Sequence, residues 1–154
     1  MSDTLLIIED EALLGSELSR HFRKEGWEVD LAASLGDARR LLLEEQREPL
    51  VVLADMSLPD GNSLDLLEEV RAAGRPGEWV LLTAYGGVPD SVRAMQLGAL
   101  DFLEKPCSSE RLGVVVNGAR RGARAQQRLR AQSEAGGRRY RAEAFIGHSE
   151  AASG

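Results

Sequence analysis

The stretch LVVLADMSLPDG, residues 50–61, decides the fold that the rest of the chain is expected to build. Its apolar residues run up to one carboxylate, Asp55, and a turn at Pro59-Asp60-Gly61 follows. A short apolar run that ends in turn residues is typical of a strand buried on both faces of a parallel sheet. Such sheets bind ligands at the carboxyl ends of their strands, which favours a site around Asp55. Taken alone, Asp55 is equally compatible with a cap for the next turn or helix.

Apolar or alternating runs on either side of this strand alternate with segments of helical periodicity. The expected strands are residues 4–8, 28–33, 50–55, 78–82 and 100–103, and the expected helices are residues 12–25, 35–45, 63–73, 90–97 and 111–132. Strands that alternate with helices pair in parallel through right-handed crossovers. We therefore predict an α/β fold, a flavodoxin-like five-stranded parallel sheet of order 2-1-3-4-5 with helices on both faces and a C-terminal helical extension.

The ends of the predicted helices carry their own signals. Ser34 is an expected N-cap of the second helix, and Ser108 or Ser109 of the last one. The last helix is expected to stop at the Gly136-Gly137 pair, because glycine is a poor helix former.

Length, charge and cysteine content narrow the class of protein. The chain has 154 residues, which suits one domain plus an extension. Residues 1–106 hold 21 acidic and 10 basic side chains, a net charge of −11, whereas residues 107–154 hold 4 and 9, a net charge of +5. The acidic part disfavours nucleic-acid binding and suits a divalent cation. With one cysteine, Cys107, and no apolar run or leader typical of membrane insertion or secretion, we expect a cytoplasmic protein with no membrane contact.

Chemically active residues stand at the ends of four of the predicted strands, and these ends share one edge of a parallel sheet. They are Glu9, Asp10, Asp55, Thr83 and Lys105. Each alone has a plain explanation, such as a helix-opening acid, a cap or a surface charge. Their common position predicts a functional site.

The residue types in this set indicate phosphoryl chemistry. Clustered carboxylates repel one another unless a cation or a proton is present. Oxygen ligands without histidine or thiolate favour Mg²⁺, Mn²⁺ or Ca²⁺, and an incomplete set leaves positions for phosphoryl oxygens. A carboxylate such as Asp55 can accept a phosphoryl group as an aspartyl-phosphate, with Lys105 neutralising charge and Thr83 donating a hydroxyl.

Four ordered blocks, IIEDE, LADMSLPDG, LLTAYG and GALDFLEKP, resemble the signature blocks of the response-regulator (CheY-like) receiver domain. The resemblance covers about residues 4–125, and we take 1–125 as the receiver. It implies that Asp55 accepts a phosphoryl group from a sensor histidine kinase. It also implies that Asp10 and Asp55 bind Mg²⁺, with Glu9 nearby and the backbone carbonyl of Ser57 as a further ligand.

The same resemblance implies a conformational switch. Thr83 would move toward the phosphoryl group, Lys105 would bridge to that group, and Phe102 would be the rotating aromatic residue. The Lys105-Pro106 peptide bond would be cis. The face formed by the fourth helix, fifth strand and fifth helix would then change its self-association. Such a domain is not an enzyme beyond its own phosphorylation and dephosphorylation. Two departures are that Phe102 has no hydroxyl and that Ser63 stands where many relatives have glycine, although we expect Ser63 to touch no catalytic position.

Residues 126–154 are predicted to be a basic linker and the start of a truncated ATPase-type domain. The phrase YRAEAFIGHSEAA, residues 140–152, resembles the opening of that module in sigma-54-dependent (NtrC-type) transcriptional activators. No GxxxxGK[ST] is present, so this chain should not hydrolyse ATP. We expect a homodimer through the switch face or the C-terminal helix, and contacts with DNA and sigma-54 RNA polymerase only through absent downstream domains. The same residues are equally compatible with a solvated charged helix.

Three other functions fit parts of the sequence. A haloacid-dehalogenase-like phosphatase also uses an aspartate nucleophile, but it needs a second aspartate where this chain has Ser57. A pseudo-receiver that docks partners without phosphorylation would not need the complete set of site residues. A nucleotide-binding flavodoxin-like protein would need a glycine-rich loop after the first strand, and none is present.

Overall fold

The computed structural model describes the backbone of residues 3–84 and 88–147. The surroundings of the side chains are described for residues 3–84 and 90–132. Five parallel strands form one sheet in the order β2-β1-β3-β6-β7. The strands are β1 Thr4–Ile8, β2 Glu28–Ala32, β3 Val51–Asp55, β6 Glu78–Thr83 and β7 Asp101–Glu104. Counted along the chain, these are the five predicted strands, and their order 2-1-3-4-5 is confirmed.

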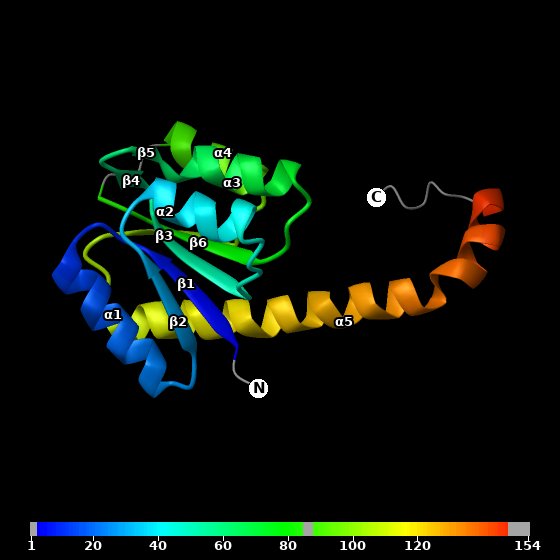
Figure 1. Ribbon diagram of the computed structural model, residues 1–154, viewed down its shortest axis with the longest axis horizontal. Helices are drawn as coiled ribbons and strands as arrows, with labels where there is room; N and C mark the ends of the chain where they lie inside the picture. The colour runs from blue at the N-terminus through cyan, green and yellow to red at the C-terminus, as the bar shows by residue number, and fades with distance from the viewer. Residues whose placement is uncertain (1–2, 85–87, 148–154) are drawn as a thin grey trace. The chain divides into compact units, whose positions relative to one another are not determined.

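The helices form a layer on each face of this sheet (Figure 1). On one face lie α2 Leu35–Arg39 with its π-helical continuation η1 Arg40–Glu44, α3 Ser63–Ala72 and α4 Val88–Gln96. On the other face lie α1 Ala12–Lys24 and the first part of α5 Ser109–Gly147. Each layer encloses its own cluster of buried apolar side chains, so the sheet is covered on both sides as predicted.

Strand β3 lies at the centre of the sheet, between β1 and β6. All of its residues are buried, and successive side chains alternate between the two apolar clusters. Val52 and Ala54 face α2, α3 and α4, whereas Val51 and Leu53 face α1 and α5. This double burial explains why the strand reads as an unbroken apolar run and why its only polar residue, Asp55, is the last one.

A two-stranded hairpin follows β3, formed by β4 Ser57–Leu58 and β5 Gly61–Asn62. The predicted turn at Pro59-Asp60-Gly61 is confirmed. Gly61 has a φ of 145°, a conformation that side-chain-bearing residues rarely adopt, and a Cβ there would lie 3.0 Å from Leu35 Cδ1. Glycine is therefore needed to bring this hairpin close to α2.

Asp60 attaches the hairpin to the N-terminus of α2. Its Oδ1 and Oδ2 each lie 3.0 Å from a backbone nitrogen, those of Leu35 and Gly36. Ser34 Oγ accepts from Asp37 N at 3.1 Å, which confirms the predicted cap. Two side chains therefore satisfy the first N–H groups of one helix, and one of them comes from the segment that follows Asp55.

We expect Asp60→Asn to lower the free energy of unfolding in a pH-dependent way. The hydrogen bonds from Leu35 N–H and Gly36 N–H lower the pKa of Asp60 below its ordinary 3.8. A lowered folded-state pKa gives stability that is present above the unfolded pKa and is lost as pH falls through the folded pKa. Urea denaturation should therefore show a clear deficit for the variant at pH 7 that shrinks below about pH 4. Glu17→Gln, at an exposed acid of α1, is the control, and a deficit that stays constant across this range would contradict the expectation.

The last helix differs from its expected bounds. Arg111 N donates to Ser108 Oγ at 3.1 Å, so Ser108 is the predicted cap. The expected stop at Gly136-Gly137 is wrong, because α5 continues to Gly147. A glycine inside a helix costs only about 1 kcal/mol relative to alanine, and strong helix formers surround this pair. The chain divides into two compact units, residues 1–123 and 124–154, and α5 belongs to both.

Smaller differences concern segment ends. Strand β2 ends at Ala32 rather than at residue 33, and α4 begins at Val88 rather than at residue 90. Periodicity did not predict the wide turns of η1. The predicted loop over residues 85–89 and the phrase IGHS, residues 146–149, lie partly outside the described residues. Within the part of the chain that is described, no helix is both long and apolar enough to cross a membrane.

Candidate functional site

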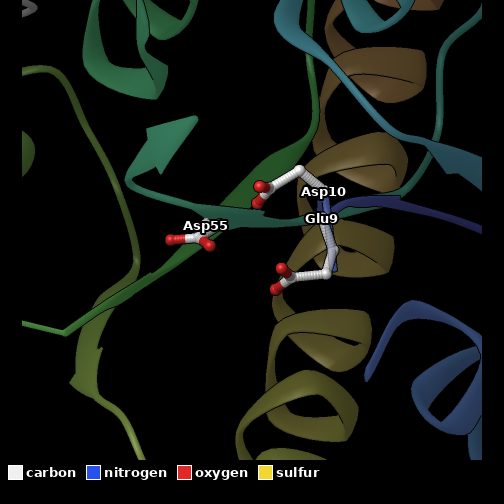
Figure 2. Close-up of side chains that lie close together, drawn as sticks. All are labelled: Glu9, Asp10 and Asp55. Atoms are coloured by element: carbon white, nitrogen blue, oxygen red, sulfur yellow. The ribbon is translucent and has the colours of Figure 1, made fainter. Parts of the chain in front are cut away.

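Three carboxylates meet at the carboxyl edge of the sheet (Figure 2). Glu9 and Asp10 directly follow β1, and Asp55 is the last residue of β3. Because Ile8 is paired with Ala54 in parallel register, the residues that follow them leave the sheet side by side. One oxygen of each carboxylate lies within 4.8 Å of the others. The structure thus brings together the three acids that the strand ends predicted to meet.

The three acids differ in their exposure to solvent. Glu9 is 3% exposed and Asp55 8%, whereas Asp10 is exposed. Burial raises the pKa of Glu9, and the hydrogen bond from Glu11 N–H, 3.1 Å from Oε2, offsets part of this. The nearby charge of Asp55 raises the pKa further, while Lys105 lowers it. Burial and the neighbouring charge of Asp55 thus disfavour the carboxylate form of Glu9, which a bound cation would stabilise.

Lys105 supplies the positive charge of the site. Its Nζ lies 2.9 Å from Asp55 Oδ2 and 3.3 Å from Glu9 Oε1. Burial alone would lower the pKa of Lys105, but the hydrogen bond to Asp55 and the charges of both acids more than offset it, so the pKa is raised. The Lys105-Pro106 peptide bond is cis, as expected. The ammonium therefore stays charged and lies against the carboxylate of Asp55.

Thr83 lies on β6, the neighbour of β3, and Phe102 lies on β7, the edge strand beyond β6. Thr83 is the last residue of β6 and is 5% exposed, and its carbonyl accepts from Lys105 N at 2.7 Å. Phe102 lies on β7, paired with Leu81, and its half-buried ring packs against the cluster under α2, α3 and α4. Thr83 is thus at the same sheet edge as Asp55, and Phe102 is one strand further along.

The segment after Asp55 holds the two serines that the sequence singled out. Ser57 is exposed at the start of β4. Ser63 is fully buried, and its hydroxyl donates to the backbone carbonyl of Asp55 at 2.5 Å. The expectation that Ser63 touches no catalytic position is therefore wrong, since it contacts the main chain of Asp55. Its N–H also donates to the carbonyl of Met56 at 2.8 Å.

Two residues that help to place Asp55 were not identified as site residues from sequence. Ser63 was noted only for replacing glycine, and Asp60 only as a turn residue. The one local signal for Ser63 is its place at the first position of the helix that follows the buried strand β3. Asp60 offered no such signal, because its partners on α2 lie 24 and 25 residues earlier in the sequence.

The donor set of the site suits a hard divalent cation. All three candidate ligand side chains are carboxylates, and no histidine or cysteine belongs to the cluster. Oxygen-only sites with few protein ligands are typical of Mg²⁺, which keeps several waters that phosphoryl oxygens can replace. The geometry therefore fits a Mg²⁺ ion beside Asp55, whose Oδ2 also contacts the ammonium of Lys105.

Comparison with known proteins agrees with this geometry. A family model described as the response regulator receiver domain matches residues 5–117. Regulatory protein LuxO of Vibrio vulnificus is 32% identical over 94% of this chain and 30% of its own length. The receiver domain of a putative LuxO repressor from Vibrio parahaemolyticus has a TM-score of 0.77 at 26% identity, covering 84% of this chain and 98% of that structure. The beryllofluoride-activated NtrC4 receiver domain dimer has a TM-score of 0.70 at 28% identity, covering 78% and 98%. The chain spans between 30% and 56% of the length of the curated relatives it matches.

Proposed function

This chain belongs to the receiver domain family of two-component response regulators, and on that premise we propose that Asp55 is its phosphoacceptor. The proposal rests on one observation above all, the contact between Lys105 Nζ and Asp55 Oδ2 within a cluster of three acids. Receiver domains are regulatory phosphoacceptors that bind Mg²⁺ at an acidic pocket, and this cluster has the matching composition. The phosphodonor is the phosphohistidine of a sensor histidine kinase.

The transfer uses the side chains already in place. An Oδ atom of Asp55 attacks phosphorus, the P–N bond of the phosphohistidine breaks, and its electron pair stays on the donor imidazole. The product is an aspartyl-phosphate on Asp55. Asp10, Asp55 and the backbone carbonyl of Ser57, with Glu9 nearby, would hold Mg²⁺, which would neutralise charge on the phosphoryl oxygens. Lys105 moves its ammonium from the carboxylate to the phosphoryl oxygens, and Thr83 donates its hydroxyl to them. Self-phosphorylation and later hydrolysis of the aspartyl-phosphate are the only reactions of this chain.

Phosphorylation acts on the surface next to the site through Thr83 and Phe102. Movement of Thr83 toward the phosphoryl group leaves space that the ring of Phe102 fills, and the absence of a hydroxyl makes this a change of packing. Three exposed apolar side chains, Val92, Met95 and Leu100, lie on α4 and on its connection to β7. They support the α4–β7–α5 face as the surface through which two copies associate, and the C-terminal helix is the alternative.

We expect beryllofluoride with Mg²⁺ to change the mass of the protein in solution. The solved NtrC4 receiver, 28% identical to this chain, is a dimer in its beryllofluoride-activated form. Light scattering coupled to size exclusion should show a shift between monomer and dimer, and Met95→Glu, which places a charge on the apolar face, should reduce the dimeric fraction. An exposed leucine on another helix gives the control, Leu13→Glu. An identical mass in both states would contradict a switch in self-association.

The similarity to LuxO and NtrC4 supports a proposal for the longer protein of which this chain would be a part. We place the receiver at residues 1–125 and a basic linker with the start of an ATPase-type domain at residues 126–154, in the regulatory part of a sigma-54-dependent activator. The whole protein would act in the cytoplasm on transcription, and DNA and RNA polymerase would be contacted by domains that this chain does not include. The LuxO match over 94% of the chain, beyond residue 117, supports this placement.

The test of the proposed function is direct labelling. Acetyl phosphate and Mg²⁺ should add the mass of one phosphoryl group, and hydroxylamine, which cleaves acyl phosphates, should remove it. Peptide mapping should find the label on the peptide that contains Asp55. No added mass, or a label stable to hydroxylamine, would overturn the proposal.

A further inference from the structure

A second charged region lies on α1, and none of its residues belongs to the carboxylate site. A cavity of about 540 Å³ is open between this helix and the edge strand β2. Its lining is cationic and hydroxylic, with one apolar wall, and consists of Ser16, Ser19, Arg20, Arg23, Lys24 and Leu31. The region stands out because residues 1–106 carry a net charge of −11.

The cations of this cavity differ from the others in the receiver. Residues 1–106 hold ten lysines and arginines. Six have a carboxylate partner, namely Arg39, Arg40, Arg47, Arg75, Arg93 and Lys105, and a seventh, Arg71, donates to backbone carbonyls. The remaining three line the cavity, and none has a carboxylate partner among the described residues. Arg23 donates one hydrogen bond, at 3.2 Å, to the carbonyl of Val29.

The three positive charges lie close enough together on α1 to repel one another. Arg20 lies three residues before Arg23 and four before Lys24, spacings at which like charges on a helix repel each other. The C-terminal end of the helix dipole relieves part of this repulsion, but Arg23 alone among the three donates a hydrogen bond within the described residues. In a chain with 21 acidic residues over the same span, this grouping is not explained by a shortage of partners.

A buried hydroxyl at the same cavity gives an independent observation. Ser19 is 4% exposed, and its Oγ has no hydrogen-bond partner among the described residues. Buried hydroxyls in proteins are almost always bonded, because an unbonded one loses its hydrogen bonds to water without replacement. Ser16 and Ser19 both line the cavity beside the three cations. The cavity thus offers more hydrogen-bond donors than acceptors. A ligand that matches it is a small anion whose oxygens accept hydrogen bonds.

We propose that this cavity binds a small phosphate-bearing anion. A phosphate monoester at neutral pH is mainly a dianion whose three terminal oxygens accept hydrogen bonds, and guanidinium groups bind such oxygens through paired hydrogen bonds. The acidic charge of the surrounding receiver repels an extended polyanion, which selects a small ligand over nucleic acid or an acidic protein segment. The apolar side chain of Leu31, 42% exposed, gives room for an organic part beside the phosphate. The site is separate from Asp55, so it stands or falls independently of phosphorylation.

The test is a titration of the full chain followed by amide NMR, in EDTA and at constant ionic strength. The probes are inorganic phosphate and, separately, adenosine monophosphate. Saturable shifts are expected at the amides of Ser19, Arg20 and Leu31. The double variant Arg20→Gln/Lys24→Gln should weaken binding about tenfold or more, as expected for lost charged hydrogen bonds. Arg111→Gln/Arg121→Gln removes the same charge from exposed positions on α5 and should keep the wild-type affinity.

Ser19→Ala tests the contribution of the Ser19 hydroxyl to binding separately from the contribution of the positive charges. Alanine is the best helix former, so the variant should fold, keep its net charge and still bind more weakly. Tighter binding of the nucleotide than of phosphate would identify an organic phosphate as the ligand, and equal binding would identify free phosphate. Shifts that do not saturate, or equal affinity in wild type and Arg20→Gln/Lys24→Gln, would overturn the proposal.

Discussion

Asp55→Asn is expected to abolish labelling by acetyl phosphate, with no phosphoryl mass detected under conditions that label the wild-type protein completely. The amide has nearly the shape of the carboxylate but lacks its negative charge and its nucleophilic oxygen pair. Among the described acids only Glu9 shares both burial and a contact with Lys105, at 3.3 Å, and we expect no phosphoryl transfer to it. Intact-mass spectrometry at several times gives the measurement.

The fold of the Asp55→Asn variant should be intact, which makes the loss interpretable. Lys105 keeps Glu9 as a partner at 3.3 Å, and the Ser63 hydroxyl still donates to the carbonyl of residue 55, which the substitution does not alter. Because the charge of Asp55 raises the pKa of Glu9, removing it also relieves repulsion within the cluster. We therefore expect thermal unfolding at neutral pH to be no lower than in the wild type.

Asp37→Asn is the matched control, since Asp37 is an exposed aspartate at the start of α2 that is remote in sequence from every site residue. This control should be labelled like the wild type. Labelling that persists in Asp55→Asn, on any residue, would remove Asp55 from the role of phosphoacceptor even if the acidic cluster still bound Mg²⁺.

The sequence predicted the parts of the site that depend on topology alone. Once the apolar runs establish a parallel sheet, the residues after β1 and β3 must leave it at the same edge, so Glu9, Asp10 and Asp55 had to meet. The contact of Lys105 with two of these acids follows from the same rule, because β7 ends at that edge too. These inferences needed only hydrophobic patterns and strand order.

The parts that sequence did not predict depend on which side chains pack together. Asp60 caps a helix that precedes it by about 25 residues, and no local pattern marks such a pair. Ser63 reaches the main chain of Asp55 only because the hairpin between them folds back. The unpartnered hydroxyl of Ser19 becomes visible only when its burial is known. Helix α5 passes through Gly136-Gly137 because a weak propensity penalty does not by itself end a helix.

Mg²⁺ is expected to stabilise the protein, and Asp10→Asn should remove most of this effect. A ligand at a hundred times its dissociation constant stabilises the folded state by about 2.7 kcal/mol if it does not bind the unfolded chain. Asp10 is the exposed member of the cluster and makes no hydrogen bond to Lys105, so its oxygens are the most accessible to a hydrated ion. Chemical denaturation with EDTA and with saturating Mg²⁺ measures the difference.

Glu11→Gln tests whether this stabilisation comes from the cluster or from acidic charge in general. Glu11 is the next residue along the chain, is exposed, and has a side chain outside the group of three acids. Removing its charge should leave the Mg²⁺ stabilisation within about 0.5 kcal/mol of the wild-type value, the range typical of surface substitutions. If Asp10→Asn and Glu11→Gln reduced it equally, the ion would be responding to the net charge of the receiver. The ligand set beside Asp55 would then be wrong, although Asp55 could still accept a phosphoryl group.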